Sequence, residues 1–226
     1  MKTYVIASTK HWNVDAFYRR RDSLPGRWLV VGDERDLTAE FVRAISPRYI
    51  FFLHWSSIVP AEIVTSVECV CFHMTDVPYG RGGSPLQNLI QRGHKETKLS
   101  VLRMTSEVDA GPVYRKVPLS LDGSAADIFG RCAQLELNIV EWVVRTEPQP
   151  KPQVGEPVIF RRRTSVQSRM PQTGTLEQVY DHIRMLDADS YPPAFLDYGQ
   201  MRYTFSEACL TGEEINARVR ITLQNS

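Results

Sequence analysis

The sequence predicts an α/β fold: a Rossmann-like, mostly parallel sheet flanked by helices, followed by a small mixed C-terminal subdomain. Two observations support this. Short apolar runs alternate with helical patterns through the first half of the chain, which is typical of βαβ units. The run at residues 49–53 is almost continuously apolar, as expected for a strand buried on both faces of a parallel sheet.

The elements follow from apolar spacing, turn residues and caps. Strands are expected at residues 4–7, 28–31, 49–53, 67–72, 99–104, 113–119 and 158–163, and short β segments at 202–205 and 218–222. Helical patterns cover an amphipathic stretch ending at Arg21, residues 37–45 with Asp36 as N-cap, a short helix from Pro60 to Val64, a helix beginning near Pro85, a long helix capped by Asp122 or Ser124, and residues 175–186.

Composition narrows the functional classes. The chain has 226 residues, is 42% apolar, and carries a net charge of +1 with a sequence pI near 7.7, so no general attraction to nucleic acid is expected. No apolar stretch approaches the roughly 20 residues that cross a bilayer, and the N-terminus lacks the features of a signal peptide. The four cysteines form no metal-ligand pattern, so we expect a cytoplasmic protein without a metal.

Residues 148–157 contain four prolines and are typical of a semi-rigid linker. We therefore expect an N-terminal catalytic domain at residues 1–147, and a linker with a small C-terminal subdomain at residues 148–226. The three consecutive arginines at residues 161–163 indicate a solvated face.

The most informative stretch is residues 70–85. An apolar strand ends at His73, a loop rich in glycine and proline follows, and a helical pattern then begins. A strand that ends at a titratable side chain presents it at the carboxyl edge of the sheet, where open α/β folds bind their ligands. Taken alone, His73 is more simply interpreted as an incidental histidine at a strand end.

Three ordered motifs change that interpretation. Cys71-Phe72-His73, Pro78, Arg81-Gly82 and Pro85 follow the pattern Asn-x-His, five residues, Pro, two residues, Arg-Gly, two residues, Pro, except at the asparagine. Met104 precedes an Asp-Ala-Gly loop at residues 109–111. An Ile-Arg-x-Leu-Asp segment at residues 183–187 leads to Tyr-Pro-x-Ala-Phe at residues 191–195.

Together these motifs resemble the folate-dependent formyltransferases, the family that includes methionyl-tRNA formyltransferase and the sugar N-formyltransferases. The resemblance covers roughly residues 1–205 and implies the formyltransferase fold. It also implies transfer of a formyl group from N10-formyltetrahydrofolate, with no metal, to a primary amine.

The resemblance assigns catalytic roles. It makes His73 the proton carrier and Asp109 the partner that orients the imidazole and favours its charged form. Both are expected in separate loops at the same sheet edge. Cys71 stands where the family has its catalytic asparagine, and a thiol is a poor substitute for a carboxamide donor. Another donor (a loop N–H, Thr75 or Asn88) takes over the oxyanion, or the rate is lower, or the chemistry differs, with Cys71 as a conceivable nucleophile.

The resemblance also implies binding residues. The pterin of the donor is expected against Ser57, Ile58, Val59, Met74, Thr75, Pro78, Thr105, Ser106, Glu107 and Val108. Arg81, Tyr79 and Trp55 are the candidates for contact with the acceptor. For Ile58 and Val59 simple packing is an equal alternative, and Arg81 is as readily a loop-bracing residue. Some sugar-specific relatives carry arginine at the position of Gly83, so that contact is absent here.

The acceptor is inferred from length and charge. The tRNA enzymes of the family are longer and carry a basic C-terminal barrel, for which this chain leaves too few residues. The expected acceptor is a nucleotide-linked 4-amino-4,6-dideoxy sugar used for cell-surface glycans, with no nucleic-acid or membrane partner and a possible homodimer. Alternatives are a formyl-folate hydrolase, a formyltransferase acting on a small purine-pathway amine, or a non-catalytic folate or nucleotide sensor.

Overall fold

The computed structural model describes residues 1–189 and 191–224. They divide into two compact units, each assembled from three separate stretches of chain. The first unit contains residues 1–82, 97–119 and 130–159, and the second contains residues 83–96, 120–129 and the chain from Phe160 onward. The expected domain boundary between residues 147 and 148 remains a prediction. Within the described residues, no helix combines the length and hydrophobicity that a bilayer crossing requires.

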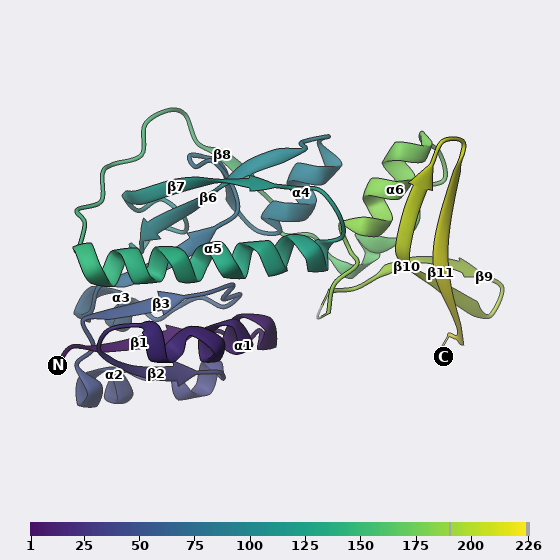
Figure 1. Ribbon diagram of the computed structural model, residues 1–226. Coiled ribbons are helices and arrows are strands. Elements are labelled where there is room, and N and C mark those ends of the chain that lie inside the picture. The colour runs from purple at the N-terminus through teal and green to yellow at the C-terminus, as the bar shows by residue number, and fades with distance from the viewer. Residues whose placement is uncertain (190, 225–226) are drawn as a thin grey trace. The chain divides into compact units, whose positions relative to one another are not determined.

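The first unit is built on a six-stranded sheet with the order β2-β1-β3-β4-β6-β7 (Figure 1). Its strands are β1 (Thr3–Ala7), β2 (Arg27–Val31), β3 (Tyr49–Phe52), β4 (Cys69–His73), β6 (Glu96–Arg103) and β7 (Val113–Ser120). The first four run parallel to one another, while β6 runs antiparallel to β4. Every residue of β3 is buried, as its apolar run predicts. The predicted mostly parallel sheet is confirmed.

Helices flank this sheet. They are α1 (His11–Arg20), α2 (Ala39–Ile45), α3 (Ala61–Ser66) and α5 (Ala125–Thr146), with 3-10 turns at η1 (Arg21–Ser23) and η2 (Glu34–Asp36). The predicted cap of α2 is wrong: Thr38, not Asp36, accepts the hydrogen bond from the Phe41 N–H. Asp36 instead ends η2, which shifts the start of α2 toward the C-terminus. At α5 the Ser124 hydroxyl accepts from the Asp127 N–H, so Ser124 is the cap.

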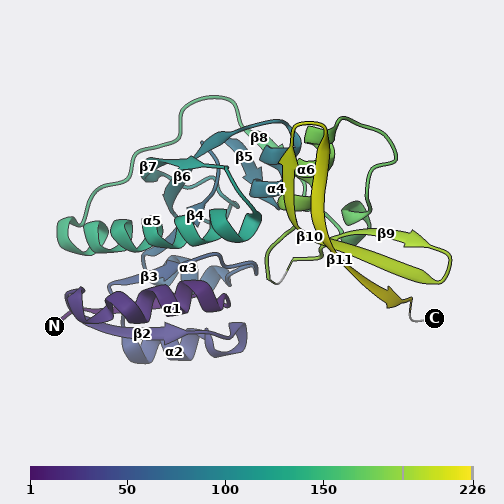
Figure 2. The same ribbon diagram turned by 45° about the vertical axis from the view of Figure 1, so that its right-hand side comes forward.

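Two short strands, β5 (Tyr79–Gly82) and β8 (Val158–Phe160), form a separate sheet. β5 lies inside the segment expected to be only a loop, because its hydrogen-bond partner comes from a distant part of the chain. The segment between α5 and β8 arches over β7 in both views (Figures 1 and 2). It is pinned to β7 by two backbone hydrogen bonds between Val113 and Lys151, of 2.7 and 2.8 Å.

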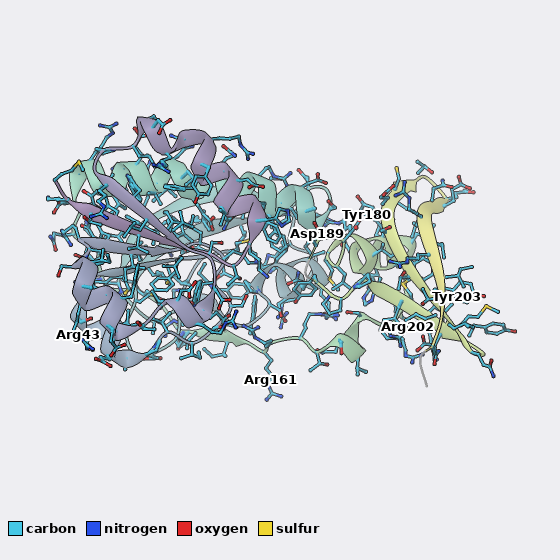
Figure 3. The ribbon with its side chains drawn as sticks, turned by 90° about the horizontal axis from the view of Figure 1, so that it is seen from below. Arg43, Arg161, Tyr180, Asp189, Arg202 and Tyr203 are labelled. Atoms are coloured by element: carbon cyan, nitrogen blue, oxygen red, sulfur yellow. The ribbon has the colours of Figure 1, made fainter. Side chains whose placement is uncertain are left out.

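The second unit contains α4 (Pro85–Gln91), η3 (Ser165–Ser168), α6 (Leu176–Arg184) and a three-stranded antiparallel sheet. That sheet has the order β11-β10-β9, with β9 (Ala194–Tyr198), β10 (Met201–Thr211) and β11 (Glu214–Leu223). Thr175 and Gln178 form a capping box at the start of α6. β9 was not expected as a strand. The Arg161 side chain projects away from the ribbon (Figure 3), and Arg162 is also exposed, whereas Arg163 is half-buried and donates to Gln91 and to the Gln167 carbonyl.

Candidate active site

His73 is the last residue of β4, and only 8% of its side chain is exposed. Its Nε2 lies 2.7 Å from the carbonyl oxygen of Gly80, a contact in which the ring must donate because a carbonyl only accepts. The Thr75 hydroxyl donates to the same oxygen at 3.3 Å. The imidazole is therefore held from one side by the returning loop.

The Asp109 carboxylate holds the other ring nitrogen. Its Oδ2 lies 3.4 Å from His73 Nδ1 and also accepts the Gly82 N–H at 2.9 Å. A ring protonated on both nitrogens donates to both Gly80 and Asp109, whereas a neutral ring serves only one of them. The site is therefore built around a histidine between two oxygen acceptors.

His73 and Asp109 do lie together, but the expected reason, that both are carried by loops at the same sheet edge, is wrong. Because β6 is antiparallel to β4, Arg103 at its end is paired with Val70, near the start of β4. The loop after β6 then turns back, and the Arg103 N–H donates to the Pro112 carbonyl at 2.9 Å. This return brings the Asp109 carboxylate to His73.

Gly111 allows that tight return. A Cβ at this position would lie 1.8 Å from the Arg103 carbonyl oxygen, so only glycine fits. Asp109 itself has a φ of 53°, a left-handed conformation that aspartate and asparagine adopt more readily than other side chains. The Asp-Ala-Gly motif thus has a steric cause as well as a chemical one.

Asp76 fixes the position of the loop after β4. Its carboxylate contacts Lys98 at 2.9 Å and Lys116 at 2.5 Å, and Lys116 also donates to the Val77 carbonyl at 2.5 Å. The two lysines lower the pKa of Asp76, against the opposing effect of burial. These contacts hold the segment that carries Gly80 and Gly82 against the sheet.

Cys71 is not set up as a nucleophile. Burial raises the pKa of its thiol well above the usual range, and the nearby Asp109 carboxylate raises it further. A thiol that stays protonated is a weak nucleophile. The structure therefore argues against the alternative in which Cys71 attacks the formyl carbon.

Two of the three substitute donors for the missing asparagine are already engaged. The Asn88 amide nitrogen donates to the carbonyls of Gly83, Ser84 and Arg161, at 3.1, 3.0 and 3.0 Å. The Thr75 side chain is fully buried and its hydroxyl serves Gly80. Backbone N–H groups of the loop are the remaining candidates.

The residues expected to contact the pterin differ in accessibility. Thr105, Ser106, Glu107 and Val108 form an exposed loop, and Ile58 is 81% exposed. Val59, in contrast, is buried in the core of the first unit, and Met74, Thr75 and Pro78 are also buried. Ser57 is half-buried and donates to Glu34. For Val59 the packing alternative therefore fits the structure.

The three expected acceptor contacts are all half-buried. Arg81 bonds to Gln153 through Nε at 3.1 Å and through a terminal nitrogen at 2.8 Å, and it lies 3.5 Å from Glu107. Trp55 packs edge-on against Phe52, with its buried indole Nε1 lacking a hydrogen-bond partner. Arg81 thus links β5 to Gln153 and to the loop that carries Glu107, and its expected contact with the acceptor stays a prediction.

Gly83 is constrained by close packing. A Cβ there would lie 2.6 Å from Cα and 2.8 Å from the backbone nitrogen of Arg162. Any larger residue, including the arginine of some sugar-specific relatives, would force these two segments apart. Among the residues that the structure describes, no cluster of His, Cys, Asp or Glu could hold a metal ion.

Gln153 was missed by the sequence interpretation. A glutamine within a proline-rich segment carries no signal of its own, because its partners (Asp109, Gly111 and Arg81) are distant in sequence. Gly82 belongs to the motif and Gly80 does not, and the backbone contacts of both with His73 and Asp109 could not be anticipated.

The α/β fold places a buried His–Asp pair at a strand end, an arrangement that is suited to holding and moving a proton. A family model described as methionyl-tRNA formyltransferase, C-terminal domain, matches residues 165–222. A solved structure named methionyl-tRNA formyltransferase from Clostridium thermocellum is 40% identical with a TM-score of 0.96, covering 99% of this chain and 100% of that one. The chain belongs to the formyltransferase family.

Other relatives are more distant. A curated methionyl-tRNA formyltransferase from Sinorhizobium medicae is 28% identical over 151 residues, which is 62% of this chain and 47% of the relative. The chain thus spans about half the length of the curated relatives it matches.

Two solved structures share the fold alone. A Mycobacterium tuberculosis protein described as a likely sugar N-formyltransferase has 20% identity and a TM-score of 0.66, covering 86% of this chain and 91% of that one. HypX from Aquifex aeolicus in complex with tetrahydrofolic acid has 18% identity and a TM-score of 0.73, covering 91% and 37%.

Proposed function

We propose that this protein transfers the formyl group of N10-formyltetrahydrofolate to a primary amine. The observation that carries the proposal is the 3.4 Å approach of His73 Nδ1 to Asp109 Oδ2. Formyl transfer to an amine needs a group that takes a proton from the attacking nitrogen and returns one to the departing nitrogen. A histidine oriented by a carboxylate is suited to both steps.

The reaction balances without another reactant. The amine nitrogen attacks the formyl carbon, and a proton of that nitrogen passes to His73. The bond between the formyl carbon and N10 then breaks, and His73 returns the proton to N10. The products are an N-formyl amine and tetrahydrofolate.

Nδ1 is the atom we assign to this proton. Of the two contacts of the ring, the one to Gly80 is short and buried, at 2.7 Å, whereas the one to Asp109 is longer, at 3.4 Å. Because Nε2 donates to Gly80, Nδ1 is the nitrogen that carries the free lone pair of the neutral ring and can accept a proton. Once protonated, the ring donates on both sides, so Asp109 and Gly80 together stabilise the charged form.

The donor substrate is assigned to the exposed loop at residues 105–108 and to Ile58. These positions are accessible, and the loop adjoins Asp109 directly. Exposed apolar and polar groups of this kind suit a flat heteroaromatic ring such as a pterin. The HypX structure named as a complex with tetrahydrofolic acid is in keeping with this donor.

The acceptor we propose is a nucleotide-linked 4-amino-4,6-dideoxy sugar. Its support is the near-neutral charge of the chain, which offers little general attraction to a polyanion such as tRNA. A second candidate is the amino group of methionyl-tRNA. It is favoured by the name of the 40% identical structure and by the family model matched at residues 165–222.

The test is a formyl-transfer assay with N10-formyltetrahydrofolate and a panel of amines: UDP-, dTDP- and GDP-linked 4-amino sugars, methionyl-tRNA and small purine-pathway amines. Release of tetrahydrofolate and mass spectrometry of the formylated product are followed together. We expect transfer to at least one nucleotide sugar, and loss of transfer in His73→Ala. Transfer only to methionyl-tRNA or to a small amine would replace the proposed acceptor.

Two further outcomes would contradict formyl transfer itself. Release of tetrahydrofolate and formate without any acceptor would make the protein a hydrolase. Binding of the folate without turnover, across the whole panel, would make it a sensor. Full transfer by His73→Ala would remove the assignment of the proton carrier.

A further inference from the structure

The segment between α5 and β8 carries one residue that turns inward. Among residues 151–159, Gln153 alone is half-buried, whereas its eight neighbours are exposed. The segment is fixed on both sides of it, by the backbone pairing of Lys151 with Val113 and by the Val158 N–H, which donates to the Pro78 carbonyl at 3.1 Å. Prolines at positions 150 and 152 restrict the backbone just before it.

Gln153 uses its whole amide group. Its nitrogen donates to the carbonyls of Asp109 and Gly111, each at 2.8 Å. Its oxygen accepts from Arg81 at 2.8 and 3.1 Å. One side chain therefore ties the loop that carries Asp109 to the loop that carries Arg81.

The two carbonyls that Gln153 holds lie on either side of Ala110, in the tight return after β6. Asp109 is in a left-handed conformation, which for a residue other than glycine persists only where its surroundings fix it. Hydrogen bonds at the carbonyls of Asp109 and Gly111 fix the peptide planes on which that conformation depends. The direction of the Asp109 carboxylate follows from this backbone geometry.

We propose that Gln153 is a positioning residue for the catalytic pair: from the proline-rich segment, it holds the Asp109 loop so that the carboxylate reaches His73. This inference rests on the proposed function. Gln153 acts through Asp109, and no contact with a substrate is assigned to it. The segment at residues 148–157, expected to be a linker, thereby becomes a structural part of the active site.

The test compares Gln153→Glu with Gln153→Lys. The glutamate keeps the acceptor for Arg81 but loses both donors, whereas the lysine keeps a donor for the carbonyls but loses the acceptor. Val154→Ala is the matched control, because Val154 is 89% exposed. We expect Gln153→Glu to lower kcat about tenfold or more while KM for both substrates stays within twofold. Gln153→Lys is expected to lie between Gln153→Glu and the wild type, and Val154→Ala to match the wild type.

A double-mutant cycle with Asp109→Asn tests whether Gln153 acts through Asp109. In the Asp109→Asn background, Gln153→Glu should cause little further loss. A full additional tenfold loss would overturn the proposal, as would a rise in KM alone, which would indicate substrate contact.

A spectroscopic readout does not depend on turnover. The ring ¹⁵N shifts of His73 report which nitrogen carries the proton, and therefore the contact of Nδ1 with Asp109. We expect these shifts to change in Gln153→Glu toward those of Asp109→Asn, with unchanged circular dichroism. Unchanged shifts would overturn the positioning role. If no amine is formylated by the wild type, the proposed function fails while this measurement still decides the role of Gln153.

Discussion

His73 Nδ1 lies 3.4 Å from Asp109 Oδ2, although the strand that precedes Asp109 runs antiparallel to the strand that carries His73. The contact is made possible by the return of the loop after β6, in which Gly111 passes against the Arg103 carbonyl. The Gly82 N–H donates to the same carboxylate oxygen, which further fixes the position of the carboxylate. Only 8% of the His73 side chain and 15% of the Asp109 side chain are exposed, so solvent has little access to this contact.

Replacing the carboxylate tests this contact directly. Asp109→Asn keeps the size of the side chain and tolerates the left-handed backbone, but it removes the charge that stabilises the protonated imidazole. We expect kcat for formyl transfer to fall about 100-fold or more, with the fold retained. Steady-state kinetics together with thermal melting will measure this. Activity within a factor of two of the wild type would remove Asp109 from the mechanism.

If Cys71 is not a nucleophile, its replacement should cause little loss of formyl transfer. Because its pKa is raised by burial and by Asp109, the thiol stays protonated at neutral pH. Cys71→Ala should keep formyl transfer within about tenfold, and Cys71→Asn, which restores the carboxamide of the family, should equal or exceed the wild type. A loss of 1,000-fold in Cys71→Ala, or trapping of a formyl thioester by mass spectrometry, would reverse this conclusion.

Glu136 predicts a pH dependence of stability. It is buried in α5, and burial raises its pKa to about 8 from an ordinary 4.5, against a weaker opposing contact from Cys132 at 3.5 Å. Between these two values the folded protein holds a proton that the unfolded chain has released. The contribution of Glu136 to the free energy of unfolding is therefore largest below pH 4.5. It falls by on the order of 4 kcal/mol as the pH rises toward 8.

Glu136→Gln is the variant that isolates this effect, because it mimics the neutral carboxyl at every pH. Urea unfolding between pH 5 and 8.5 should show a wild type that loses stability with rising pH and a variant that loses distinctly less. The exposed Glu213→Gln serves as the control, with an unchanged profile. Parallel profiles for wild type and Glu136→Gln would show that Glu136 is not protonated in the folded protein.

The C-terminal sheet offers a surface for the expected homodimer. The strand registers place one set of apolar residues on a single face: Leu196, Tyr198, Met201, Tyr203, Phe205, Val219, Ile221 and Leu223. Six of the eight are between 44% and 76% exposed, and together they expose on the order of 500–850 Å². That approaches the roughly 800 Å² per partner of a stable interface. The register places Arg202 and Arg220 on the opposite face, so this apolar face suits a second copy of the chain rather than a polyanion.

Ile221→Glu should therefore produce a monomer, whereas Arg220→Glu, its neighbour on the opposite face, should leave the dimer intact. Light scattering coupled to size exclusion, compared with the chain mass of 25.8 kDa, measures both. A wild type that runs as a monomer at micromolar concentration would end this prediction.

Local patterns were sufficient for the order of strands and helices in the first half of the chain, because each element buries one apolar face and ends at its own cap or turn. They failed where pairing is distant. β5 was interpreted as a loop because its partner, β8, follows it by more than seventy residues. The start of α2 moved for a local reason, since a 3-10 turn ends at Asp36 and Thr38 takes over as the cap.

The sequence by itself determined the family, through a histidine, an aspartate and the glycines and prolines that a motif places at set intervals. Only the tertiary structure decided how these residues are assembled. The antiparallel β6, the return of the Asp109 loop, the contact of Asn88 with Arg161, and the role of Gln153 all depend on contacts between residues far apart in the chain. Such contacts leave no periodic or local signal, because they are fixed by packing in three dimensions and not by neighbouring residues.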